Sequence, residues 1–315
     1  MSHVPVLLEE TLEGLALQPA GVYLDATVGA GGHAQAIAER LVGVRLIGLD
    51  RDPQTLEATR RRLAPLEDKV CLRVANFVYL KRELQAEGVA ALEGALFDLG
   101  VSSMQLGQAG RGFSFLTDGP LDMRMGPDAA QTAADLLNSI TACELAKLIR
   151  DYGEERFAQR IAAAIVSYRE HHGCLSHTVE LARIIEAALP APARRKASVH
   201  PATRTFQAIR IAVNDELNAI LPALEDAFEL LKPGGRLVVI AFHSLEDRLV
   251  KRFFKAKAQG CTCPPKLPQC VCGKTPQAKC FPLIRPSKDE VAHNPRARSA
   301  RLRVAQKRVA CQDTK

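Results

Sequence analysis

Apolar positions in the first hundred residues form short runs that alternate with stretches of helical periodicity. The runs predict strands at Val22–Leu24, Val44–Leu49, Val70–Ala75 and Ala95–Leu99. The stretches between them predict helices at Ala34–Leu41, Asp52–Ala64 and Tyr79–Glu87. Asp52 is suited to cap the second helix, and Pro53 to its first position. Strands that alternate with helices are typical of a parallel α/β sheet.

The alternation stops after residue 100 and returns after residue 204. In between, the spacing predicts helices only, at Ala133–Asn138, Glu144–Arg150, Glu155–Glu170 and Val179–Ala188, with a capping box that opens at Thr141. Beyond it we expect a long helix at Thr205–Leu231 with a break near Pro222, and then a turn at Lys232–Gly235. A strand at Arg236–Phe242, a helix at Leu245–Ala258 and a last strand at Arg301–Ala305 should follow. The pattern predicts a Rossmann-like α/β core at 1–106 and 205–315, interrupted by a helical domain at 107–204.

A glycine turn, Gly29–His33, follows the first strand and its terminal Asp25. Asp50 ends the second strand, where a carboxylate can accept hydrogen bonds from both hydroxyls of a ribose. The spacing Gly29-x-Gly31-x-x-Ala34 fits a dinucleotide, and it also fits S-adenosylmethionine. Asp25 favours S-adenosylmethionine, because a carboxylate repels a pyrophosphate but attracts a cationic methionyl group.

More polar or aromatic residues follow other predicted strands. Asp98 is followed by Ser102 and Ser103, His243 by Ser244, and Phe77 comes just after the third strand. The carboxyl ends of parallel strands share one edge of the sheet, where ligands bind in open α/β folds. Phe77 could pack on an adenine ring there. The alternative for each residue is a strand-end cap or a core position.

Charge divides the chain into two unequal parts. The net charge is +7, but residues 248–315 hold 17 Lys and Arg against 3 Asp and Glu, a balance of +14. The remaining 25 bases and 32 acids give −7. The contrast suggests a polyanion partner for the C-terminal part, with a solvated basic tail as the alternative. Arg194, Arg195 and Lys196 add a small basic cluster.

The chain carries no apolar run of about eighteen residues, and acids occupy its first residues where a signal peptide needs bases. We therefore expect a cytoplasmic protein without a membrane partner. Its nine cysteines should be reduced thiols or metal ligands.

The loop 261–272 and the last strand each allow two interpretations. Four cysteines could form a tetrahedral zinc site in this loop: Cys261, Cys263, Cys270 and Cys272. Their C-x-C spacing is weaker evidence for zinc than the common C-x-x-C spacing. The sequence therefore favours the alternative, a proline-stiffened loop with reduced thiols.

The last strand carries bases that fit phosphate contacts, or that protect an exposed sheet edge, at Arg296, Arg298, Arg301, Arg303, Lys307 and Arg308.

Several long motifs occur in a specific order: Gly29–His33, Asp98–Gln105, Arg111–Phe115, Asp118–Met125, Tyr152–Arg156, His200–Gln207, Phe242–Arg248 and Asn294–Ser299. With these motifs the chain resembles the bacterial 16S ribosomal RNA cytosine-N4 methyltransferases. The resemblance implies a class I methyltransferase core with an inserted helical domain for RNA recognition, and S-adenosylmethionine as cofactor. It places the cofactor against Gly31, Gly32, His33, Asp50, Phe77, Asp98 and Gln105.

The implied reaction needs a group that accepts hydrogen bonds from the weakly nucleophilic N4 amine. Asp98 is the first candidate for this catalytic role and His243 the second. Two rival functions remain: an NAD(P)-dependent oxidoreductase, which the glycine turn permits, and a non-catalytic RNA-binding assembly factor. The sequence leaves open whether the chain forms a homodimer.

Overall fold

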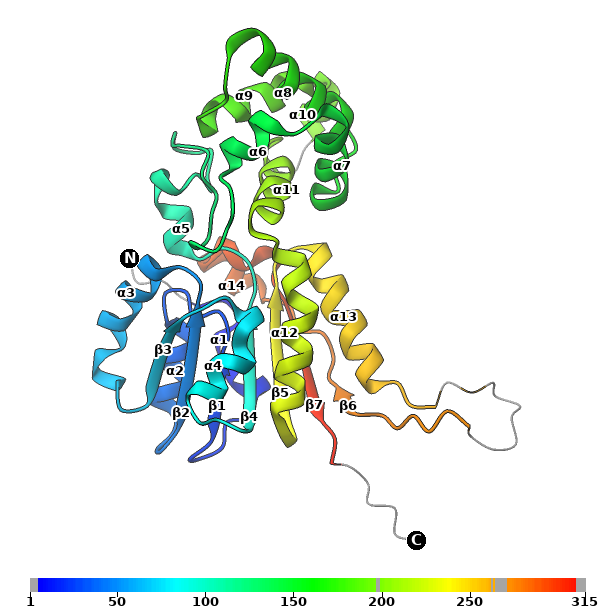
Figure 1. Cartoon of the computed structure of the whole chain (residues 1–315). Helices are drawn as coiled ribbons and strands as arrows, with labels where there is room; N and C mark the ends of the chain where they lie inside the picture. The colour runs from blue at the N-terminus through cyan, green and yellow to red at the C-terminus, as the bar shows by residue number, and fades with distance from the viewer. Residues whose placement is uncertain (1–4, 197–198, 262, 264–270, 310–315) are drawn as a thin grey trace. The chain divides into compact units, whose positions relative to one another are not determined.

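The computed structural model describes residues 5–196, 199–261, 263 and 271–309 (Figure 1). The chain divides into two compact units, one made of Met1–Gly100 and Leu217–Lys315, the other of Val101–Glu216. The first unit is built on a sheet, and the described part of the second contains helices and loops. The two units are therefore described in turn.

The sheet of the first unit has the strand order β3-β2-β1-β4-β5-β7-β6. Its strands are β1 (Val22–Asp25), β2 (Arg45–Asp50), β3 (Val70–Val74), β4 (Leu92–Asp98), β5 (Leu231–Ala241), β6 (Ala278–Cys280) and β7 (Arg301–Lys307). β1 to β5 run parallel, while β7 pairs antiparallel with both β5 and β6 (Figure 1). The order of the first five strands is that of a doubly wound nucleotide-binding sheet, so the predicted Rossmann-like core is confirmed.

Helices cover both faces of this sheet. They are α1 (Leu8–Leu15), α2 (Gly32–Arg40), α3 (Pro53–Leu63), α4 (Leu80–Ala86), α12 (Glu216–Leu230), α13 (Ser244–Ala258) and α14 (Lys288–His293). Successive strand residues point to opposite faces, so β5 sends Leu237 and Val239 into one apolar cluster. Val238 and Ile240 enter the other cluster. Because both faces are buried, the core strands read as continuous apolar runs.

Two local predictions around these strands have different outcomes. Asp52 caps α3, as predicted, by accepting hydrogen bonds from the backbone of Gln54 and Thr55. The turn predicted at 232–235 is wrong, because these residues belong to β5. They form an irregularity in its pairing with β4, which passes from Leu92↔Leu231 directly to Gly94↔Arg236.

The second unit has its own apolar core. Its helices are α5 (Ser103–Gly107), α6 (Ala133–Ser139), α7 (Ala142–Gly153), α8 (Ala158–His172), α9 (Thr178–Ala188), α10 (Ala191–Lys196) and α11 (Thr203–Asn214). Thr141 opens α7 in a capping box with Glu144, as predicted. α11 packs Phe206, Ile209 and Val213 into this core. The structural division therefore follows α11, whereas the sequence reading placed that helix in the sheet domain.

The long helix predicted at Thr205–Leu231 is broken, but the predicted position of the break is wrong. Asp215 adopts a left-handed backbone with φ of 50°, which separates α11 from α12. Pro222 lies inside α12. An aspartate is among the few side chains that tolerate this conformation, so the chain can turn there without a glycine.

Candidate functional site

The glycine turn between β1 and α2 is closely packed. Gly29 and Gly31 have positive φ values of 51° and 78°. A Cβ atom on Gly31 would lie 2.7 Å from Cγ2 of Thr59, and one on Gly32 would lie 2.4 Å from Cγ of Pro5. Both conformation and space therefore require glycine at Gly31, and the turn presents bare backbone beside the strand ends.

Asp50 joins this turn to the end of β2. Its Oδ2 accepts a hydrogen bond of 2.8 Å from the Gly29 amide, and its Oδ1 accepts one of 2.9 Å from the Asp52 amide. Burial raises the pKa of Asp50 to about 6, although both hydrogen bonds oppose the rise. The carboxylate is thus fixed at the place where the sequence predicts an acceptor for ribose hydroxyls.

Asp25 ends β1 and Asp98 ends β4, and the charge of Glu246 on α13 also acts on Asp98. Asp25 is buried, and this burial raises its pKa to about 7 with a further contribution from the charge of Asp50. The pKa of Asp98 lies well above its usual range because of burial and then the charges of Asp25 and Glu246. Oδ1 of Asp98 is buried and has no hydrogen-bond partner among the described residues. This concentration of acids favours a cationic ligand.

His33 lies next to this cluster. Its Nε2 is 3.0 Å from the Val6 carbonyl oxygen, which can only accept, so Nε2 carries the hydrogen. Nδ1 then faces Oδ2 of Asp98 at 3.6 Å. Nδ1 therefore presents a lone pair toward the carboxyl group, at a distance slightly beyond that of a hydrogen bond.

His243 forms the N-cap of α13. Its Nδ1 accepts a hydrogen bond of 3.4 Å from the Glu246 amide, and its Nε2 lies 3.2 Å from Oε1 of the same residue. Oε2 of Glu246 accepts a hydrogen bond of 2.9 Å from the Phe242 amide. Sequence reasoning missed Glu246 as a member of the acidic cluster, although its position three residues after a strand-end cap resembles a capping box.

Phe77 and Gln105 complete the predicted set. Phe77 follows β3, half-buried, and its ring packs edge-on against Phe97 at 5.8 Å between centroids. Gln105 belongs to the second unit, where its Oε1 accepts a hydrogen bond of 3.0 Å from the Ser102 amide in the capping box of α5. The first unit thus assembles the predicted residues Gly31, Gly32, His33, Asp50, Phe77, Asp98 and His243 at the carboxyl edge of its sheet.

The basic residues of β7 have partners within the first unit. Arg301 and Arg303 each donate a hydrogen bond of 2.7 Å to the carboxylate of Asp247. Burial raises the pKa of Asp247, but these two arginines outweigh it and keep the pKa below its usual range. Nζ of Lys307 donates to the carbonyls of Glu229 and Leu231. Since β7 lies between β5 and β6, its interpretation as an exposed edge strand is wrong.

Helix α13 carries a second set of bases that face solvent. Arg248, Lys251, Arg252 and Lys255 are all exposed, and their spacing puts them on one side of the helix. We call these four residues the basic face of α13. Val250, Phe253 and Phe254 are buried and pack into the core. The helix therefore presents a fixed row of positive charge.

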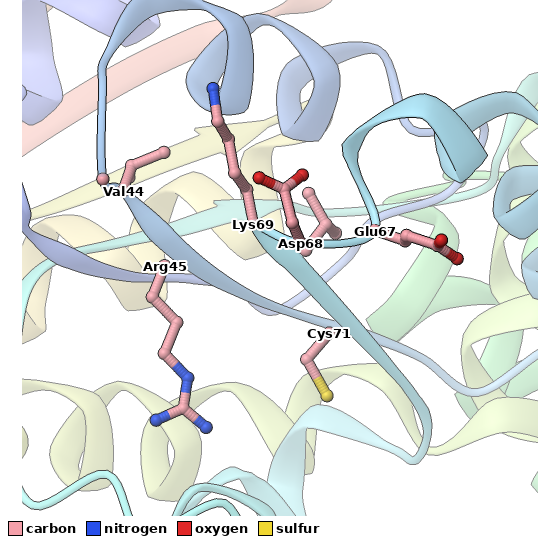
Figure 2. A pocket seen from close by; sticks show the side chains of 8 residues that line it. Val44, Arg45, Glu67, Asp68, Lys69 and Cys71 are labelled. Atoms are coloured by element: carbon pink, nitrogen blue, oxygen red, sulfur yellow. The ribbon is translucent and has the colours of Figure 1, made fainter.

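A separate pocket of about 280 Å³ opens where β2 and β3 begin, lined by residues 43–45 and 67–71 (Figure 2). Arg45 and Cys71 point to one side of the strands and Lys69 to the other. Nζ of Lys69 already donates to the Ala38 carbonyl, and Arg45 pairs with Glu87. In open α/β sheets, ligands bind at the carboxyl ends of the strands, which lie opposite to this pocket. The pocket is therefore separate from the candidate site.

None of the described helices is long and apolar enough to cross a membrane.

Comparison with known proteins gives a consistent result. The chain matches the MraW methylase family over residues 1–308. It is 53% identical over 310 residues to ribosomal RNA small subunit methyltransferase H of Heliobacterium modesticaldum, covering 97% of this chain and 98% of the relative. The enzyme of the same name from Symbiobacterium thermophilum is 52% identical over 316 residues, covering 99% of both chains. The match to a solved rRNA methylase from Streptococcus thermophilus covers 98% of this chain and 100% of the solved chain. With 12% identity and a TM-score of 0.45, this similarity supports no conclusion.

Proposed function

The chain belongs to the MraW methylase family and is a methyltransferase, and on that premise we propose that it transfers a methyl group from S-adenosylmethionine to N4 of a cytidine in 16S rRNA of the small ribosomal subunit. The observation that carries the choice of methyl donor is the acidic cluster of Asp25, Asp98 and Glu246, in which Asp25 and Glu246 are buried and Asp98 is half-buried. S-adenosylmethionine brings a positively charged sulfonium and an ammonium group. Its charge complements the cluster, whereas the pyrophosphate of a dinucleotide would be repelled.

The residues of the first unit divide the binding task. Asp50 accepts hydrogen bonds from the ribose hydroxyls, and Phe77 packs against the adenine. The glycine turn lets the backbone approach the ligand, and its closest neighbours already exclude a Cβ atom at Gly31. Asp25 lies under the turn and stabilises the cationic methionyl part. Gln105, the remaining residue that the resemblance assigns to the cofactor, is buried in the second unit.

Asp98 is the proposed catalytic residue. The donor supplies a methyl group on a sulfonium, whose positive charge passes to the N4 amine as the new N–C bond forms and the C–S bond breaks. Asp98 accepts a hydrogen bond from that amine and then takes its proton. When ionised, Asp98 is a better proton acceptor than an ordinary aspartate because its pKa is raised, and its Oδ1 has no hydrogen-bond partner among the described residues. His243 is the second candidate, because its Nε2 faces the Glu246 carboxylate.

The RNA partner requires a positively charged surface. The basic face of α13 supplies one on the first unit, and we assign it to phosphate contacts. The helical unit is the proposed RNA-recognition domain, with Arg194 and Arg195 on α10 as additional exposed bases. A ribosomal substrate also places the proposed activity in the cytoplasm.

Methyl transfer to isolated small ribosomal subunits tests the proposal. The full chain is incubated with labelled S-adenosylmethionine and subunits that lack the modification, and the RNA is then digested for nucleoside mass spectrometry. We expect label in N4-methylcytidine, and far less of it when Asp98→Asn replaces the wild type. Label on another nucleoside would contradict the proposed acceptor. RNA binding without any transfer would favour the assembly factor.

A further inference from the structure

The described residues between α13 and β6 have little apolar packing. The two ends of this segment are joined, because the Gln277 amide donates a hydrogen bond of 2.8 Å to the Lys257 carbonyl. The Arg308 amide holds the Gln277 carbonyl in turn, also at 2.8 Å. Most described residues from 259 to 277 are exposed or half-buried, and Val271 is 80% exposed. Short segments without an apolar core usually need a cross-link to hold one conformation.

Three thiols converge within this loop. The sulfur atoms of Cys261, Cys263 and Cys272 all lie within 4.8 Å of one another. Those of Cys261 and Cys272 are 3.7 Å apart, which is far longer than the bond of about 2.05 Å in a disulfide. A tetrahedral zinc ion with Zn–S bonds of about 2.3 Å holds its sulfur ligands about 3.8 Å apart. The observed separation is the length of a thiol–thiol hydrogen bond in this structure, and it is also close to the spacing of two sulfur ligands of one metal ion.

Backbone amides also point at these sulfur atoms. The Cys263 amide donates to Sγ of Cys261, and the Val271 amide donates to Sγ of Cys263, each at 3.4 Å. These hydrogen bonds fix the directions in which the sulfur atoms of Cys261 and Cys263 point. The loop therefore arranges its sulfur atoms as a metal-binding loop does.

We propose that Cys261, Cys263 and Cys272 bind one zinc ion that closes the loop after α13. Each thiol loses a proton to water as its Zn–S bond forms. Soft thiolate ligands in a tetrahedral arrangement select zinc over the hard cations Mg²⁺ and Ca²⁺. The fourth position is left for one further donor. Cys270, part of the original sequence pattern, lies outside the described residues.

Metal analysis of the full chain, purified with reductant and without chelator, tests the site. We expect about one equivalent of zinc in the wild type and almost none in the triple variant Cys261→Ser/Cys263→Ser/Cys272→Ser. The matched control is Cys143→Ser/Cys174→Ser, which alters two exposed cysteines of the helical unit and should keep the metal. In apo wild type, added Co²⁺ should give thiolate charge-transfer absorption, and the triple variant should give none.

The folding of the triple variant is checked separately by circular dichroism and by S-adenosylmethionine affinity, which should stay near the wild-type values. Its loop should become more sensitive to limited proteolysis. Wild type that stays metal-free after incubation with Zn²⁺ and desalting would overturn the proposal. So would a triple variant that keeps its zinc, or a peptide map in which Cys261 and Cys272 are disulfide-bonded.

Discussion

Two sets of charged residues in the first unit differ in how they meet solvent. The acids at this edge of the sheet, Asp25, Asp98 and Glu246, are close together and largely withdrawn from water. Burial raises the pKa of Asp25 and Asp98, and the charges of Asp25 and Glu246 raise that of Asp98 further. The bases of the α13 face are exposed, and their spacing gives a row rather than a cluster. A compact group of withdrawn acids suits a small cationic ligand, whereas a row of exposed bases attracts a large polyanion.

The largest expected effect is on the rate of methyl transfer when Asp98 is neutralised. Asp98→Asn keeps the shape of the side chain but removes the proton acceptor, so we expect kcat to fall by at least about 100-fold. S-adenosylmethionine affinity should also fall, because Asp98 belongs to the acidic cluster that complements the cation, but by less than kcat, because Asp50 and the glycine turn remain. Single-turnover kinetics and calorimetry measure the two quantities. A rate within a few-fold of wild type would remove Asp98 from the chemistry.

Asp50→Ala should act on binding. It removes the acceptor of the Gly29 amide and, in our proposal, of the ribose hydroxyls. We expect S-adenosylmethionine to bind more weakly by roughly 1–3 kcal/mol, the scale for hydrogen bonds to a charged group. The protein should stay folded, since Asp50 lies at a strand end. Unchanged affinity in calorimetry would show that the ribose lies elsewhere.

The acids also predict how binding depends on pH. Asp25 and Asp50 have pKa values raised to about 7 and about 6, so a bound cation should favour their ionised forms. S-adenosylmethionine affinity should therefore rise between about pH 5 and pH 8, by up to tenfold per pH unit for each group that titrates. The raised pKa of Asp25 has the opposite effect on the folding stability of the free protein. Protonated Asp25 stabilises the fold, and this contribution to the free energy of unfolding is lost as pH rises from about 4, the unfolded-state pKa, to about 7.

Asp25→Asn is the control for this pH dependence. The variant should bind more weakly at pH 8 and show a flatter profile, while titration of the ligand itself is common to both proteins. A wild-type profile in the variant would assign the pH dependence to another group.

The comparison also shows what the sequence could predict. The places of Gly31, Asp50 and Asp98 at the turn and the strand ends could be predicted, because they belong to a local strand–turn–helix pattern that periodicity reveals directly. Glu246 was missed because its role depends on Asp98, far away in the chain. The partners of Arg301 and Arg303 were missed because β7 inserts antiparallel between β5 and β6, a pairing that no local pattern encodes. The break at Asp215 needed a left-handed aspartate, which propensity does not predict.

The basic face of α13 can be tested by charge reversal. The variant Lys251→Glu/Arg252→Glu/Lys255→Glu should weaken RNA binding and reduce the salt slope by about one unit per lost phosphate contact. S-adenosylmethionine affinity should not change, because the altered side chains lie on the solvent side of the helix. Filter binding across a salt series measures the RNA effect. The control variant Arg60→Glu/Arg61→Glu/Arg82→Glu makes the same change in net charge at other exposed positions. Equal losses of RNA affinity in both variants would show that only net charge matters.

The smallest expected effect on RNA binding comes from Arg303, although it belongs to the basic C-terminal segment. Its Nε holds the buried carboxylate of Asp247, and its side chain is only 18% exposed. Arg303→Gln should therefore leave RNA affinity and salt slope near wild type, but lower the free energy of unfolding by about 1–3 kcal/mol. The depressed pKa of Asp247 means that this contribution is present at pH 7 and lost as pH falls through that folded-state pKa. Urea unfolding at pH 7 and in acid should show the difference between variant and wild type shrink. Loss of RNA binding with unchanged stability would instead make Arg303 a phosphate contact.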